Sequence, residues 1–270
     1  VEVDVWNPPF NDQRQREQKL YTPLEKAQKK WRIRVFIPHL KDDYWLGVNY
    51  GLIHEARRLG VSLSIYEAGG YDQLDVQRRQ IENVIAENPD GLIIGAISLD
   101  GLNDLVKKAS DKGIPVLDLI NGMSSPHIAA RAAVSFWDMG FQAGSYLRRL
   151  QENSGQPLKL AWFPGPDGAG WVKSGDAGFR SAIEGGMIEI LDSQYGDTGS
   201  AAQTKLIEAT LEAWGAPASF EEFEAQNPHL LSKTLLRLYY SRERVFSPQA
   251  KQSFVGPDLA PLPRPPRPTP

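Results

Sequence analysis

The chain has 270 residues, of which 41% are hydrophobic, and its formal net charge is -3. It contains no cysteine, which excludes disulfides, thiolate metal sites and cysteine catalysis. No apolar run approaches the roughly 20 residues of a membrane helix, and no basic block suits a nucleic-acid backbone. We therefore expect a chain with a sizeable core that neither inserts into a membrane nor binds nucleic acid.

The first half of the chain carries a regular alternation after a polar start. Residues 1–30 are interpreted as an arm packed on the outside of the first lobe, with helical character at residues 23–30. Short β-branched runs separated by amphipathic helices then favour βαβ units on a parallel sheet. Strands are expected at residues 32–38, 61–67, 91–96 and 114–120, and helices at 44–59, 74–87 and 102–112. Gly60, Gly91 and Gly113 lie near helix-to-strand joints, where glycine adopts a left-handed backbone at little cost.

A second series follows residues 129–135. Helices are expected at residues 138–150, 172–184 and 201–213, and strands at 158–163 and 187–195. The pattern predicts an α/β protein of two lobes with parallel sheets, a hinge near Phe136 and a ligand held between the lobes.

The alternation stops after Trp214, so the second lobe is expected to be incomplete or divergent after residue 213. The proline-rich end is expected to be extended or disordered. The predicted organisation is an arm (1–30), a first lobe (31–136), the start of a second lobe (137–214) and a divergent segment (215–270).

Polar and aromatic side chains gather where the first two strands end. Asp42, Asp43, Tyr44 and Trp45 follow the first strand, and Tyr71 follows the second after a glycine pair. Open α/β sheets bind ligands outside the carboxyl ends of their strands. Because ring faces attract cations, acids beside aromatic rings suit a small, positively polarised, methyl-rich molecule.

The sequence also allows structural roles for the same residues. Trp45 and Tyr71 are also explained as core aromatics, and Asp42 or Asp43 as caps of the following helix. Trp137, beside the hinge, is equally explained by packing. The glycine-rich loop at residues 164–170, which includes Asp167, lacks the ending of a phosphate-binding loop. It is interpreted as the loop through which the second lobe contacts the ligand. Its backbone N–H groups are then available as donors to an oxygen atom of the ligand.

Nothing in the sequence nominates a catalytic group or a cofactor. The four histidines have no metal-ligand spacing, and no serine lies in a nucleophile motif. We therefore expect a binding protein that has no cofactor and is not an enzyme.

With these residues in view, the chain resembles the TorT-type periplasmic binding proteins. These are two-lobed type I proteins that sense trimethylamine N-oxide and work with a membrane sensor histidine kinase. The resemblance covers roughly residues 20–213 and rests on motifs that include Tyr44-Trp45-Leu46, Asn49-Tyr50-Gly51, Glu67-Ala68-Gly69-Gly70-Tyr71, Pro164-Gly165-Pro166-Asp167, Gly178-Phe179-Arg180 and Gly196-Asp197.

The resemblance implies a periplasmic sensor with an aromatic cage formed by Trp45, Tyr71 and Trp137. The family's late second-lobe tyrosine has no match in this chain. Three alternatives stay open: a transporter's binding protein for a sugar or other solute, a LacI-type regulator, and a truncated relative that binds little. The regulator would need an N-terminal helix-turn-helix, for which residues 1–30 have no suitable pattern.

Overall fold

The computed structural model of the protein describes residues 2–5 and 17–214. The chain divides into two units, residues 1–206 and 207–270. The predicted proline-rich end and the predicted divergence beyond residue 214 lie outside the described residues.

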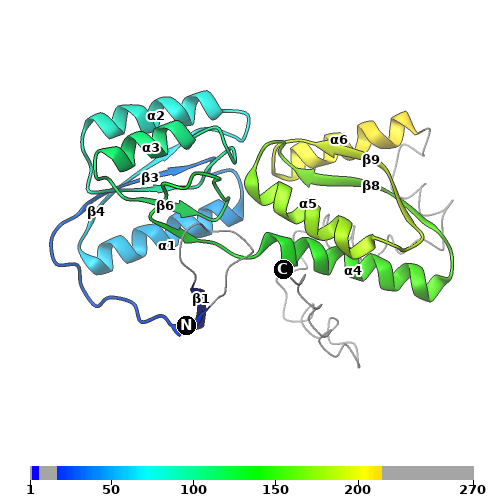
Figure 1. The fold of residues 1–270 in the computed structure, drawn as a ribbon. Coiled ribbons are helices and arrows are strands. Elements are labelled where there is room, and N and C mark those ends of the chain that lie inside the picture. Colours follow the sequence, from blue (N-terminus) through cyan, green and yellow to red (C-terminus); the bar gives the residue numbers. More distant parts are fainter. Residues whose placement is uncertain (1, 6–16, 215–270) are drawn as a thin grey trace. The chain divides into compact units, whose positions relative to one another are not determined.

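A five-stranded parallel sheet forms the centre of the first half, in the order β4-β3-β5-β6-β7. Its strands are β3 (Arg32–Ile37), β4 (Ser62–Glu67), β5 (Gly91–Ile94), β6 (Val116–Leu119) and β7 (Ala130–Ala132). Three helices connect them: α1 (Asp43–Leu59), α2 (Leu74–Ala86) and α3 (Asn103–Asp111). Figure 1 shows α2 and α3 on one face of this sheet and α1 on the other.

The residues of β3 explain why helices cover both faces of the sheet. Successive side chains of a strand point to opposite faces. Phe36 belongs to the buried cluster under α2 and α3, whereas Val35 and Ile37 pack with Trp45 under α1. All three β3 residues are fully buried, so this strand anchors the loop that follows it.

A separate two-stranded parallel sheet is formed by β8 (Leu158–Gly165) and β9 (Ile188–Tyr195). Its helices are α4 (Phe136–Ser154), α5 (Gly170–Ile183) and α6 (Ser200–Ala213). Helices α4 and α5 approach each other through glycine. A Cβ atom built on Gly140 would lie 1.9 Å from the carbonyl oxygen of Gly175, and one on Gly178 would lie 2.0 Å from that of Trp137. Only glycine permits this backbone contact.

The helices and strands predicted from residue 32 to residue 213 are confirmed in type and order, with shifts of a few residues at the ends, but the short strand β7 was not predicted. The predicted hinge position is the start of α4, which is capped by Ser135 and begins at Phe136. Gly60 and Gly113 have the expected left-handed backbone, but Gly91 does not, and Asn88 adopts it instead.

The helical character predicted for residues 23–30 is wrong. No helix forms there, because backbone groups of this segment hydrogen-bond to residues of α1 rather than to one another. Arg58 donates to the carbonyl oxygens of Leu24 and Glu25, and the Ala27 N–H donates to the Leu59 carbonyl at the end of α1. The antiparallel pair of β1 (Glu2–Val5) and β2 (Glu17–Leu20) was not predicted.

Candidate functional site

The loop after β3 is built around Asp42, which caps α1. Its Oδ1 accepts a hydrogen bond from the Trp45 N–H at 3.0 Å, which confirms the capping role that the sequence left open. Among the described residues, the one basic side chain within 4 Å of this carboxylate is His39, at 3.9 Å. Asp42 therefore combines a structural cap with a negative charge that no lysine or arginine compensates at that distance.

Trp45 is held rigidly by this loop and by the sheet. Its side chain is 2% exposed and packs with Val35 and Ile37. A Cβ atom on Gly95, just after β5, would lie 2.6 Å from the indole Cη2. The indole thus fills a space that only glycine leaves open at the carboxyl end of the sheet.

Tyr71 lies after β4 and is 8% exposed. Its ring centroid lies 6.2 Å from that of Trp171 and 5.6 Å from that of His39, and both pairs are arranged edge to face. Burial raises the pKa of Tyr71 to about 12, although three nearby N–H groups favour the ionised form. Those groups belong to Asn121, Trp45 and Trp171. The tyrosine is therefore neutral at physiological pH.

Asn121 is a site residue that the sequence prediction missed. Its Nδ2 donates to the Tyr71 hydroxyl at 3.0 Å and to the Ala96 carbonyl oxygen at 2.8 Å. The preceding Ile120 has a φ of 69°, a left-handed conformation that a β-branched residue rarely adopts. Such strain costs on the order of 1–3 kcal/mol and often marks a functional position. In the sequence, Asn121 and Gly122 follow a hydrophobic strand and predict only an ordinary turn, so nothing there indicates a site residue.

The segment between β9 and α6 bonds to the loops after β3 and β4. Asp197 Oδ2 lies 3.1 Å from the Lys41 ammonium, and its Oδ1 accepts from the Tyr71 N–H at 3.4 Å. The Thr198 hydroxyl lies 2.8 Å from His39 Nε2 and 3.4 Å from Asp42 Oδ2. The sequence resemblance included Asp197 only as part of a motif, and its contacts could not be inferred from spacing.

His39 is fully buried and uses both ring nitrogens. Its Nδ1 accepts from the Lys41 N–H at 3.2 Å, so Nε2 carries the proton and donates to Thr198. Burial lowers the pKa of His39 from its ordinary 6.5, against the opposing effect of nearby carboxylates. The imidazole is therefore a neutral donor between two loops.

Stability is expected to fall as the pH drops below about 6.5, because the unfolded chain then binds a proton that buried His39 resists. His39→Gln removes this titration and should flatten the decline. Denaturant unfolding at several pH values measures the effect. His54→Gln, on the exposed side of α1, is the matched control. Its stability should fall with pH as that of the wild-type chain does. A His39→Gln variant with the wild-type slope would contradict the assignment.

The remaining predicted site residues lie in different surroundings. Tyr44 is 52% exposed and meets the Trp45 ring edge to face at 5.9 Å. Trp137 lies in the first turn of α4 and stacks on Phe141 at 5.0 Å. Asp167 is exposed in the loop before α5. The ring of Tyr71 contacts that of Trp171, and its hydroxyl lies near the indole N–H of Trp45. The contacts given for the described residues do not join Tyr71 to Trp137, and the cage role of Trp137 stays a prediction.

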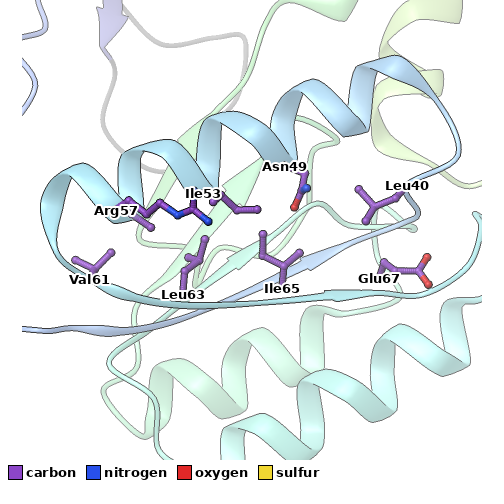
Figure 2. A pocket seen from close by; sticks show the side chains of 9 residues that line it. Leu40, Asn49, Ile53, Arg57, Val61, Leu63, Ile65 and Glu67 are labelled. Carbon is purple, nitrogen blue, oxygen red and sulfur yellow. The ribbon is translucent and has the colours of Figure 1, made fainter.

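One cavity lies away from this aromatic site. It has a volume of about 490 Å³ and runs between α1 and the edge strand β4 (Figure 2). Aliphatic side chains such as Ile53, Leu63 and Ile65 line it, with Arg57 and Glu67 toward its two ends. None of the six predicted ligand-binding residues lines this cavity.

Comparisons with known proteins agree with the fold and the motifs. The family model described as "Periplasmic binding protein domain" matches residues 33–216. The chain belongs to the periplasmic binding protein family. Among curated relatives, the periplasmic protein TorT of Escherichia coli K12 is 39% identical over 191 residues, which cover 71% of this chain and 54% of TorT. The chain is thus a TorT-type member that spans about half the length of the curated relatives it matches.

Two solved structures extend the comparison. An ABC transporter solute binding protein from Bradyrhizobium sp. BTAi1 with bound Bis-Tris is 47% identical, with a TM-score of 0.60 over 78% of this chain and 64% of that one. TorT in a complex with the TorS sensor domain, without ligand, is 27% identical, with a TM-score of 0.55 over 73% of this chain and 70% of that one. The fold is therefore the type I periplasmic binding protein fold.

A metal site and a membrane-spanning helix each have requirements that the described residues do not meet. Within them, no group of three or more acidic, histidine or cysteine side chains is arranged to hold a metal ion. None of the described helices has the length and apolar character needed to cross a bilayer.

Proposed function

We propose that this chain is the ligand-binding part of a periplasmic sensor protein that binds trimethylamine N-oxide or a similar small methylated amine. It binds this molecule without transforming it and passes the signal to a membrane sensor histidine kinase. The observation that carries the proposal is that the Trp45 indole N–H lies near the Tyr71 hydroxyl, beside the Asp42 carboxylate. The likeness to TorT, and to TorT in its complex with the TorS sensor domain, supports the sensor role and the periplasmic location.

The chemistry of the site suits a methylated amine. The methyl groups around a quaternary-like nitrogen carry partial positive charge, which aromatic faces attract. Asp42 adds a negative charge, and His39, the basic side chain nearest to it, is neutral. A sugar would instead need several amide and charged side chains around its hydroxyl groups, and Asn121 is the amide that contacts Tyr71.

Signalling follows from the contacts of the segment between β9 and α6. Asp197 and Thr198 bond to the same loops that hold Trp45 and Tyr71. A ligand that contacts both sets of residues at once favours the arrangement in which they meet, and so shifts the population toward it. The sensor domain of the kinase reads that population.

A second candidate function is a solute-binding protein of a transporter. The 47% identical relative is described as an ABC transporter solute binding protein and holds Bis-Tris, a tertiary amine with hydroxyl groups. This candidate uses the same site for a hydroxylated solute such as a sugar, and replaces the kinase by a transporter.

A thermal unfolding panel separates the candidates. A ligand present at a free concentration of about 100 times its dissociation constant stabilises the folded chain by about 2.7 kcal/mol. Trimethylamine N-oxide is expected to raise the unfolding temperature, whereas pentoses and hexoses are not. A shift with a sugar alone would favour the transporter candidate. The absence of any shift in a chain that unfolds cooperatively would overturn the proposed ligand, and the absence of a cooperative transition would favour the truncated relative.

A further inference from the structure

Trp171 is an aromatic residue that the predicted cage did not include. It is the second residue of α5, and its ring lies 5.7 Å from that of Phe136 and 6.2 Å from that of Tyr71. Gly165 makes room for it: a Cβ atom there would lie 2.7 Å from the indole Cη2. The φ of Gly165 is 124°, a value that suits glycine alone, so the end of β8 is shaped around this ring.

The indole N–H of Trp171 is buried and has no hydrogen-bond partner among the described residues. Trp162, on β8, differs in this respect, because its N–H donates to Asp176 Oδ1 at 2.8 Å. Buried indole N–H groups usually find an acceptor, so an unpaired one beside a binding site indicates that the acceptor comes from the ligand.

The surroundings of this N–H favour an oxygen acceptor. It lies near enough to the Tyr71 hydroxyl to stabilise negative charge there, together with the N–H groups of Asn121 and Trp45. Asn121 already donates to that hydroxyl and to the Ala96 carbonyl oxygen, whereas the buried Trp171 N–H beside the rings has no bonded acceptor among the described residues. An amine oxide carries a negatively charged oxygen directly on its methylated nitrogen, and hydrogen bonds to charged acceptors are shorter and stronger than neutral ones.

We propose, on the basis of the function proposed above, that the Trp171 N–H donates a hydrogen bond to the oxygen of the bound amine oxide. Trp171 is then a specificity-determining residue. The rings and Asp42 recognise the methylated nitrogen, and Trp171 distinguishes the oxide from the parent amine. The parent trimethylammonium ion has the same three methyl groups but offers a donor where the oxide has an acceptor.

The test is a calorimetric titration of the chain and its Trp171→Phe variant with trimethylamine N-oxide and with trimethylammonium. Phenylalanine keeps an aromatic face, removes the donor and makes the side chain smaller, and the comparison of the two ligands separates the loss of the donor from the loss of packing. The variant is expected to bind the oxide about 10- to 100-fold more weakly, as for a hydrogen bond to a charged group, and to bind trimethylammonium with little change. Trp162→Phe is the matched control and should keep the affinity of the wild-type chain for the oxide.

An independent measurement follows the indole N–H resonances of the wild-type chain by NMR. The Trp171 signal, identified by its loss in Trp171→Phe, should move downfield with the oxide and much less with trimethylammonium. Unchanged oxide affinity in Trp171→Phe, or an equal loss for both ligands, would overturn the inference and leave the proposed function in place. If the wild-type chain binds neither molecule, the proposed function fails and this inference fails with it.

Discussion

Trp45→Ala is expected to abolish binding of trimethylamine N-oxide and to lower the free energy of unfolding by about 3–5 kcal/mol. The indole is 2% exposed, packs against β3 and covers Gly95, so its removal opens a cavity that the sheet cannot close. The indole of Trp45 is also expected to contact the methyl groups of the ligand through one of its faces. Denaturant unfolding and calorimetric titration measure the two effects separately.

Two variants separate the loss of the ring face from the loss of the fold. Trp45→Phe keeps an aromatic face and should retain weakened binding in a folded chain. Tyr50→Ala, on the same helix and 71% exposed, should change stability by no more than about 0.5 kcal/mol and leave binding intact. Binding of the oxide by a folded Trp45→Ala chain with wild-type affinity would contradict the contact.

Gly178→Ala is expected to lower the free energy of unfolding by about 3 kcal/mol. The new methyl carbon would lie 2.0 Å from the Trp137 carbonyl oxygen, which belongs to the backbone of α4 and can yield only if the two helices separate. Overpacking of this kind costs about 1–3 kcal/mol and sometimes more, well above the intrinsic helical advantage of alanine. Denaturant unfolding provides the measurement.

Gly51→Ala in α1 is the matched control for this variant. No atom lies within 4 Å of the position that its Cβ would occupy, so only the helical preference acts. A gain of about 0.5–1 kcal/mol is expected. The two substitutions are chemically identical and should have opposite signs. A gain in Gly178→Ala as well would show that α4 and α5 do not approach as described.

The order of helices and strands was predictable because it depends on local patterns. The apolar runs of β3 and β5 and the acidic start of α1 have short-range signatures, and Asp42 occupies the cap position that its sequence favours. The false helix at residues 23–30 shows the limit of such patterns. Its backbone bonds to Arg58 and Leu59, which are distant in sequence, and those contacts override local preference.

The candidate site was predictable only in part. Trp45 and Tyr71 follow strands directly, so the ends of those strands place them at the same edge of the sheet. Asn121 and Trp171 reach the same site from later elements, one through a strained isoleucine and the other through the space at Gly165. Neither a left-handed backbone at Ile120 nor an unpaired indole N–H leaves a mark in the sequence.

The most direct test of the account is a calorimetric titration of the wild-type chain with trimethylamine N-oxide, with a hexose titrated in parallel. We expect a saturable heat of binding for the oxide at about one site per chain and none for the hexose. No heat with the oxide, from a chain that unfolds cooperatively, would contradict the proposal that Trp45, Tyr71 and Asp42 form a site for a methylated amine.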